Sequence, residues 1–309
     1  MTERDRHWRS RSAFLYLTSI NVGRGPWVAV KVRRTSTSPM SPDVLARNNV
    51  KVAGSGKQPM LFAHGFGCDQ NMWRFVAPAF ADDYKLVLFD YVGSGKSELS
   101  AYDANRYASL EGYARDVLDI IHALDLRDVI FVGHSVSAMV GVLAANREPD
   151  RFARLVLIGP SPRYINDPPN YVGGFERSDI EGLLETMDKN YIGWANYLGP
   201  AIMKNADRPE LGAELTESFC STDPVIARRF AEATFFSDNR DDLQHVRVPT
   251  LVLQCSEDII APNSVGEFVH QQTPGSTLRV MRAQGHCPHM SAPEETVSLI
   301  REYLESPVD

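Results

Sequence analysis

The sequence is poor in cysteine, has no long apolar run and carries no excess of positive charge. Its four cysteines, Cys68, Cys220, Cys255 and Cys287, stand singly without CxxC or other metal-binding spacing. We therefore expect no disulfide framework, metal site or cofactor, and a reducing compartment, the cytoplasm. No stretch reaches the roughly 20 apolar residues that cross a bilayer. The net charge of −7 argues against a nucleic-acid-binding surface.

What is present is typical of a globular protein, because 43% of the 309 residues are hydrophobic and 23% are charged. The first 43 residues differ from the rest. They hold eight basic and three acidic residues and a Ser/Thr/Pro cluster over 35–42, but no apolar core of a signal peptide. We interpret 1–43 as an extension outside the fold, either a disordered tail or sequence upstream of a true start at Met40. Residues 44–309 are expected to form the domain.

From about Asn48 onward, short apolar runs alternate with longer amphipathic segments such as Leu110–Leu124. Most of the short runs are continuously apolar, which is typical of strands buried on both faces of a parallel sheet. The pattern predicts an α/β fold, with a mostly parallel central sheet covered by helices on both faces. The predicted strands are 50–53, 60–63, 86–90, 129–132, 155–158, 250–254 and 278–281.

This alternation stops after Gly159. Residues 162–242 contain no strand pattern but several short amphipathic segments separated by proline and glycine. Helices inserted between two core strands are typical of a cap over an active site. The aromatic residues of this segment suit the roof of an apolar pocket.

The segment Gly133–Ser137, GHSVS, follows the apolar run 129–132 and precedes a stretch of small residues. A serine at the apex of a strand, a tight turn and a helix resembles the nucleophile elbow of the α/β-hydrolase fold. We expect Ser135 to be the nucleophile. The backbone N–H of Val136, at the start of the helix, would stabilise a developing oxyanion. Ser137 stands where the general motif has glycine, and it is still small.

A second oxyanion donor is predicted in the segment His64–Gly67, HGFG, which follows the strand 60–63. In this fold the loop at that place supplies a backbone N–H, here that of Phe66. Flanking glycines allow the loop to approach the substrate. The Phe66 ring would form one wall of the pocket.

The acid and the base are expected after the strands 250–254 and 278–281. We predict Asp258 rather than Glu257 as the acid, because an Asp-x-x-x-Pro pattern recurs in this fold. We predict His286 as the base, with His289 in a supporting or helix-capping role. Metal ligation by these two histidines is not expected, because no acid or cysteine cluster lies nearby in the sequence. The order Ser, Asp, His is that of α/β-hydrolases.

Several motifs beyond the elbow are similar to those of the bacterial RsbQ proteins, whose group includes the plant karrikin and strigolactone receptors. They are HGFGCDQ at 64–70, FDYVGSG at 89–95, GHSVSAM at 133–139, GGFE at 173–176 and HCPHMSAP at 286–293. The resemblance implies a serine hydrolase with a four-helix cap, a small hydrophobic cavity and a small ester or lactone as substrate. It also implies a PAS-domain phosphatase partner in a general-stress sigma-factor pathway.

The resemblance carries site residues over by position. The catalytic residues are Ser135, Asp258 and His286, and the oxyanion donors are Phe66 and Val136. We further predict that the substrate-binding residues are Phe66, His134, Phe175 and Trp194. Two functions share this one site. The first is turnover of a hydrophobic ester or lactone through an acyl-enzyme, and the second is ligand sensing with slow hydrolysis and partner binding.

Overall fold

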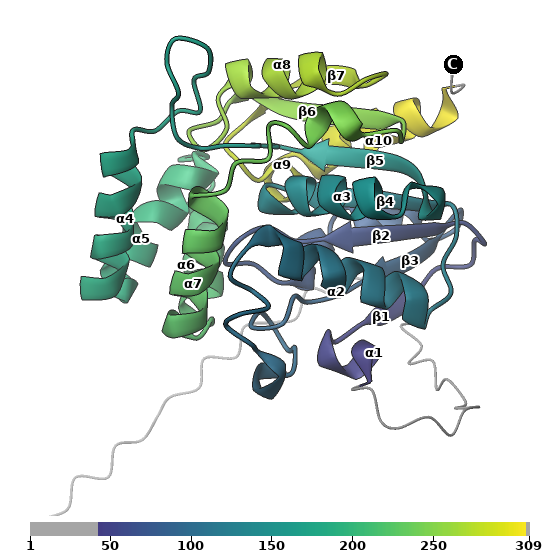
Figure 1. Cartoon of the computed structure of the whole chain (residues 1–309), viewed down its shortest axis with the longest axis horizontal. Coiled ribbons are helices and arrows are strands. Elements are labelled where there is room, and N and C mark those ends of the chain that lie inside the picture. The colour runs from purple at the N-terminus through teal and green to yellow at the C-terminus, as the bar shows by residue number, and fades with distance from the viewer. Residues whose placement is uncertain (1–42, 307–309) are drawn as a thin grey trace, which may run out of the picture.

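A seven-stranded sheet forms the centre of the protein in a computed structural model that describes residues 43–306 (Figure 1). Apart from Asp43, the predicted N-terminal extension lies outside the described residues. β1 is antiparallel to its neighbour β3, and every other pair of neighbouring strands is parallel. The seven predicted strands are confirmed. Their spatial order is β1 (Lys51–Ala53), β3 (Lys85–Leu88), β2 (Pro59–Ala63), β4 (Val129–His134), β5 (Phe152–Ile158), β6 (Thr250–Glu257) and β7 (Thr277–Gln284).

Helices cover both faces of the sheet, as the continuous apolar runs predict (Figure 1). α2 and α3 pack on one face, and α10 packs on the other together with the 3-10 helices Gln70–Trp73 and Ala77–Phe80. The helices outside the cap are α1 (Val44–Arg47), α2 (Leu110–Ala123), α3 (Val136–Arg147), α8 (Asn263–Gln272), α9 (Pro288–Ser291) and α10 (Pro293–Glu305). The remaining 3-10 helices are Leu99–Ala101, Pro149–Arg151 and Leu243–His245.

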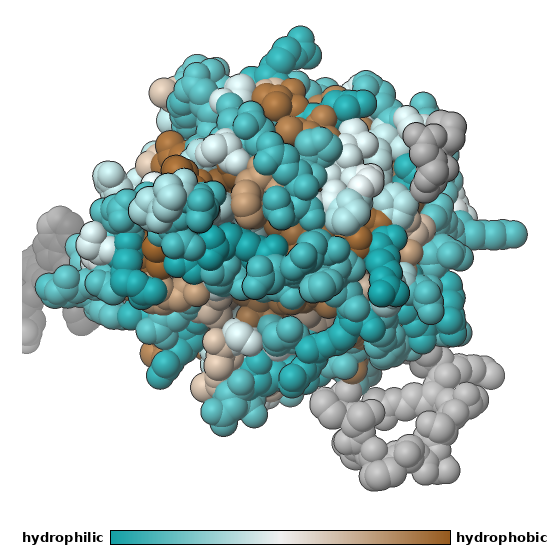
Figure 2. All heavy atoms as spheres, turned by 45° about the horizontal axis from the view of Figure 1, so that its top comes forward, coloured by the Kyte–Doolittle hydropathy of each residue, from teal (hydrophilic) through white to brown (hydrophobic). Residues whose placement is uncertain are grey.

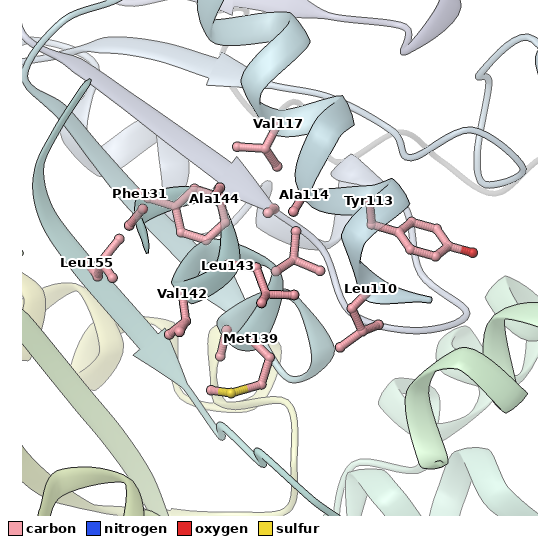
Figure 3. Packing of buried hydrophobic residues seen from close by; sticks show 14 of the residues in the cluster. Leu110, Tyr113, Ala114, Val117, Phe131, Met139, Val142, Leu143, Ala144 and Leu155 are labelled. Atoms are coloured by element: carbon pink, nitrogen blue, oxygen red, sulfur yellow. The ribbon is translucent and has the colours of Figure 1, made fainter. Parts of the chain in front are cut away.

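Each face of the sheet has its own hydrophobic core, and alternate residues of one strand point into the two cores. In β4, Phe131 packs beneath α2 and α3, whereas Ile130 and Val132 face the opposite side of the sheet. Both sets are almost fully buried, and this double burial is why the strands read as unbroken apolar runs. Figure 3 shows the core between the sheet and α2 and α3, where side chains of these helices pack against Phe131 of β4 and Leu155 of β5.

Four helices form the predicted cap between β5 and β6. They pack on one another at one end of the sheet (Figure 1), and their buried side chains form a core that also takes in Met72 and Met290 from outside the cap. The cap helices are α4 (Arg177–Lys189), α5 (Tyr191–Met203), α6 (Pro209–Cys220) and α7 (Pro224–Phe235).

Three further features of the molecule are its surface, its cysteines and the lengths of its helices. The face in Figure 2 is mainly hydrophilic, with hydrophobic residues in small separate groups. All four cysteines are free, and only Cys220 is exposed. Within residues 43–306, none of the helices has the length and apolarity needed to span a membrane.

Candidate active site

Ser135 lies at a sharp turn between β4 and α3. Its backbone has φ of 57° and ψ of −124°, a conformation that costs a non-glycine residue on the order of 1–3 kcal/mol. The Ser135 N–H donates to the carbonyl of Ile158 at 2.8 Å, which ties the turn to the end of β5. A Cβ at Gly133 would lie 2.6 Å from the carbonyl oxygen of Ser137. Glycine is therefore required at 133 for the chain to reverse so tightly.

The structure brings together the three side chains predicted to form the catalytic centre. The Oγ of Ser135 lies 2.7 Å from Nε2 of His286, and Nδ1 of His286 lies 2.6 Å from Oδ2 of Asp258. All three residues are buried. The sequence separates Ser135 from His286 by 151 positions, but both follow parallel strands and meet at the same edge of the sheet.

Asp258 is held by the backbone that follows it. Its Oδ1 accepts hydrogen bonds from the N–H groups of Ile260 at 2.8 Å and Ala261 at 3.1 Å, which leaves Oδ2 for the histidine. Its side chain is 0% exposed, whereas that of Glu257 is 55% exposed and pairs with Lys204. Asp258 is thus the carboxylate that faces His286.

The backbone of His286 is fixed from two sides. Its N–H donates to the carbonyl of Ile202 in cap helix α5 at 2.9 Å. Its carbonyl oxygen accepts a hydrogen bond from Nε2 of His134 at 2.7 Å. His134, which precedes the serine, therefore supports the histidine loop from the sheet side.

Two further histidines near this centre are held neutral by their surroundings. Burial lowers the pKa of His134 well below its usual value, and nearby histidines lower it further. Burial also lowers the pKa of His289 to about 3. The rings of His134 and His289 lie 4.4 Å apart, and His289 lies 4.7 Å from the ring of Trp73. A neutral His134 that donates from Nε2 has an unprotonated Nδ1.

Ser137 has a role that the sequence pattern did not indicate. Its hydroxyl donates to the carbonyl of His64 at 2.5 Å and lies 2.9 Å from the hydroxyl of Tyr91. The N–H of Tyr91 in turn donates to Nε2 of His64 at 3.2 Å. This closed network links the start of α3 to the loop that carries Phe66. The two predicted oxyanion donors, the N–H groups of Phe66 and Val136, therefore belong to segments that are hydrogen-bonded to each other.

A cavity lies between the serine and the cap. It encloses about 430 Å³ of space that no atom fills, part of it open to solvent. Ser135, His286, Tyr164 and Thr234 are among its few polar residues. Burial raises the pKa of Tyr164, an effect reduced by a hydrogen bond with the Ser135 side chain. The full lining is Phe66, Cys68, His134, Ser135, Tyr164, Leu198, Ile202, Leu215, Phe219, Thr234, Phe235, Ile260, His286 and Cys287.

The surroundings of the two thiols in this lining disfavour their thiolate forms. Burial raises the pKa of Cys68 and of Cys287 far above its ordinary value, with smaller contributions from nearby acidic groups. Both thiols therefore stay protonated, and only a thiolate is a good nucleophile. In residues 43–306, no three His, Cys, Asp or Glu side chains are grouped so that they could hold a metal ion.

The predicted substrate-binding residues divide into two groups. Phe66 and His134 line the cavity, but Phe175 and Trp194 are absent from its lining. Trp194 is buried one layer further out, with its ring 6.2 Å from that of Phe66 and 5.1 Å from that of Phe219. Phe175 packs against the core of the cap. Three other aromatic residues of the predicted cap segment, Tyr164, Phe219 and Phe235, do line the cavity. Thr234 lines it as well, because the rotation of each cap segment decides which side chain points inward.

Comparison of the chain with known proteins shows its family. Residues 60–299 match the Alpha/beta hydrolase family. The chain belongs to this family. A karrikin insensitive 2 receptor of Petunia hybrida is 39% identical over 258 residues, which cover 83% of this chain and 95% of the receptor. A strigolactone esterase of Pisum sativum is 39% identical over 255 residues, which cover 82% and 95% of the two chains.

A solved structure resembles this alpha/beta hydrolase still more closely in sequence. A hydrolase from Oleispira antarctica superposes with a TM-score of 0.84 at 47% identity, covering 86% of this chain and 97% of its own. The alignments with the two plant relatives and with the Oleispira antarctica hydrolase each cover nearly the full length of the relative. The resemblance to the group that includes the karrikin and strigolactone receptors is thereby confirmed.

Proposed function

We propose that this alpha/beta hydrolase is a serine hydrolase that cleaves a small hydrophobic ester or lactone through an acyl-enzyme. The observation that carries the proposal is the chain of short hydrogen bonds from Ser135 through His286 to Asp258 at the base of an apolar cavity. Nε2 of His286 takes the proton of Ser135 as Oγ attacks the acyl carbon. Asp258 keeps the imidazole oriented and stabilises its charged form.

The remaining steps use the same groups. The N–H groups of Phe66 and Val136 donate to the carbonyl oxygen as it becomes negative. The bond from the acyl carbon to the alkoxy oxygen breaks, and His286 gives its proton to that oxygen, which leaves as an alcohol. In a lactone the alcohol stays attached to the acyl group. Water then gives its proton to His286, attacks the acyl carbon and releases the acid, and Ser135 recovers its proton.

The chemistry of the cavity supports the substrate class. Most lining residues are aliphatic or aromatic, and many of them belong to the core of the cap. Apolar groups bind such walls, whereas a charged substrate would lose its hydration without compensation. Among the relatives, one is named a strigolactone esterase and matches over most of this chain, which supports an ester or lactone bond as the one attacked.

A fluorophosphonate probe and a p-nitrophenyl acetate assay test this proposal. The native protein should be labelled at Ser135 and should release p-nitrophenol. Ser135→Ala should lose both signals while its melting temperature stays within a few degrees of the native value. Ser221→Ala, at an exposed cap position, is the matched control and should keep both. Labelling that persists in Ser135→Ala would disprove the assigned nucleophile.

A second candidate is ligand sensing, in which slow hydrolysis accompanies signalling to a partner. It is favoured by the karrikin receptor among the relatives. In this version the protein acts in the cytoplasm with a PAS-domain phosphatase in a stress-responsive sigma-factor pathway. Turnover well below about 10 per second and ligand-dependent binding to a purified PAS-domain phosphatase support it. Fast turnover, with no such binding and no stress phenotype on deletion, supports the metabolic enzyme.

A further inference from the structure

Thr234 carries a buried hydroxyl that has no hydrogen-bond partner within residues 43–306. It lies in the last turn of α7, is 1% exposed and lines the cavity beneath the cap. A hydroxyl that is neither hydrated nor hydrogen-bonded destabilises a folded protein. Its presence at the cavity wall therefore calls for an explanation.

Other helical threonines of this chain show what Thr234 does not do. Thr186, Thr216 and Thr296 each donate to the carbonyl four residues earlier, at 2.8, 3.0 and 3.0 Å. That bond is the usual way for a threonine inside a helix to satisfy its hydroxyl. The hydroxyl of Thr234 makes no such bond to the backbone of α7, so its proton is available at the cavity.

The other polar groups of the lining are already engaged. Ser135 is bonded to His286, and the Tyr164 hydroxyl lies close enough to the Ser135 side chain for that side chain to lower the pKa of Tyr164. His134 also has an unpartnered atom, Nδ1, but that atom faces the backbone, because a Cβ at Gly65 would lie 2.6 Å from it. Thr234 is the hydroxyl among the described lining residues that remains available to a ligand.

We propose that Thr234 Oγ donates a hydrogen bond to a second oxygen of the substrate, separate from the carbonyl that Ser135 attacks. This inference rests on the proposed function of the same site. It narrows the substrate class to esters or lactones that carry an additional ether, ring or carbonyl oxygen. Such an oxygen only accepts, so one donor satisfies it. A substrate hydroxyl would need both a donor and an acceptor, and the apolar wall offers too few.

A pair of matched esters tests the assignment through turnover. The p-nitrophenyl esters of tetrahydrofuran-3-carboxylic acid and cyclopentanecarboxylic acid have rings of similar shape, and only the first has a ring oxygen. Thr234→Val keeps the shape of the side chain and removes the hydroxyl. We expect this variant to lower the ratio of kcat/KM for the oxygen-containing ester to that for the carbocyclic ester by about tenfold. Comparing ratios cancels the different intrinsic reactivity of the two esters.

Thr234→Ser is the matched control, because it keeps the hydroxyl and removes only a methyl group. Its ratio should stay within about threefold of the native ratio, because the two rings have similar shape and the loss of the methyl contact affects both esters alike. An equal ratio in the native protein and in Thr234→Val would overturn the assignment. If Thr234→Ser lowers the ratio of kcat/KM values as much as Thr234→Val does, the effect comes from packing, and the assignment of Thr234 is overturned too.

Ligand binding without turnover separates this inference from the proposed mechanism. In the Ser135→Ala background, the methyl esters of the same two acids should raise the melting temperature to different extents. The oxygen-containing ester should give the larger shift, and Thr234→Val should remove the difference. If Ser135→Ala still hydrolyses esters, the proposed mechanism fails while this binding comparison still tests Thr234. Equal shifts for both esters, with Thr234 intact, would overturn the inference alone.

Discussion

The two sides of the cavity are built differently. On the sheet side, the polar groups are fixed by short hydrogen bonds, such as those that join Ser135, His286 and Asp258. On the cap side, aromatic and aliphatic side chains pack by shape, and Thr234 presents a hydroxyl with no partner among the described residues. The first side is suited to holding reacting atoms in place. The second is suited to selecting a ligand.

The contrast has a physical origin. Backbone hydrogen bonds between neighbouring parallel strands set the positions of the loops at their ends, so sheet-side groups lie on a rigid frame. The cap helices satisfy their backbone groups internally, and their relative placement depends on side-chain packing. Changes on the sheet side should therefore affect mainly kcat, whereas changes on the cap side should affect mainly KM.

After Ser135→Ala, the largest expected effect is also on the sheet side, at Asp258. Asp258→Asn should lower kcat by about 10⁴-fold, because an amide in that position favours the wrong tautomer of His286. KM should change far less, since Asp258 is absent from the cavity lining. Stopped-flow and steady-state assays with p-nitrophenyl acetate measure both constants.

Glu257→Gln is the matched control for this prediction. Glu257 directly precedes Asp258, but its side chain is largely exposed and faces Lys204. We expect its kcat to stay within about twofold of the native value, because exposed ion pairs contribute little. A comparable loss of kcat in Glu257→Gln would mean that the acid has been misassigned.

The network that joins the two oxyanion segments should have the next largest effect. Ser137→Ala removes the bond to the carbonyl of His64, and Tyr91→Phe removes the bond to Ser137. Each should lower kcat by about tenfold, less than the 10²- to 10³-fold cost of losing an oxyanion donor outright. The double variant should lose little more than either single one, because both changes break one network. A rise in KM at constant kcat would contradict this role.

Acid should destabilise the fold through its buried neutral histidines. The pKa of His289 falls from 6.5 to about 3 on folding, and those of His64 and His134 are also lowered. Below pH 6.5 the unfolded chain binds protons that the folded chain does not. The free energy of unfolding is thus highest above about pH 7. His289 lowers it by about 1.4 kcal/mol per pH unit below that, and His64 and His134 lower it further.

Urea unfolding between pH 7.5 and 4.5 measures this dependence. His289→Gln should reduce the slope by about one proton across pH 6 to 4.5, because glutamine does not titrate. His245→Gln, at an exposed position, should leave the slope as it is. An unchanged slope in His289→Gln would show that this histidine takes up its proton in the folded protein.

The sequence predicted which loops meet on the sheet side and that aromatic residues roof the cavity, but it did not predict which individual cap residues line the cavity. Ser135, Asp258 and His286 follow apolar runs whose pairing in a parallel sheet brings the loops together. A sequence pattern places a side chain on a helix, but it does not give the rotation of that helix against its neighbours. Trp194 was therefore predicted to line the cavity and lies behind it, while Thr234 gave no signal.

The smallest expected effect on KM is that of Trp194→Phe, because Trp194 lies behind the residues that line the cavity. Trp194→Phe keeps an aromatic ring against Phe66 and Phe219, and the lost indole N–H has no partner within residues 43–306. KM should change by less than about threefold and kcat should not change. Phe219→Leu alters the cavity wall itself and should raise KM by about tenfold. The substitution removes apolar contact with the ligand, and one methylene of such contact is worth ~1–3 kcal/mol. If Trp194→Phe changes KM as much as Phe219→Leu, Trp194 contacts the ligand directly and the cap must rearrange to expose it.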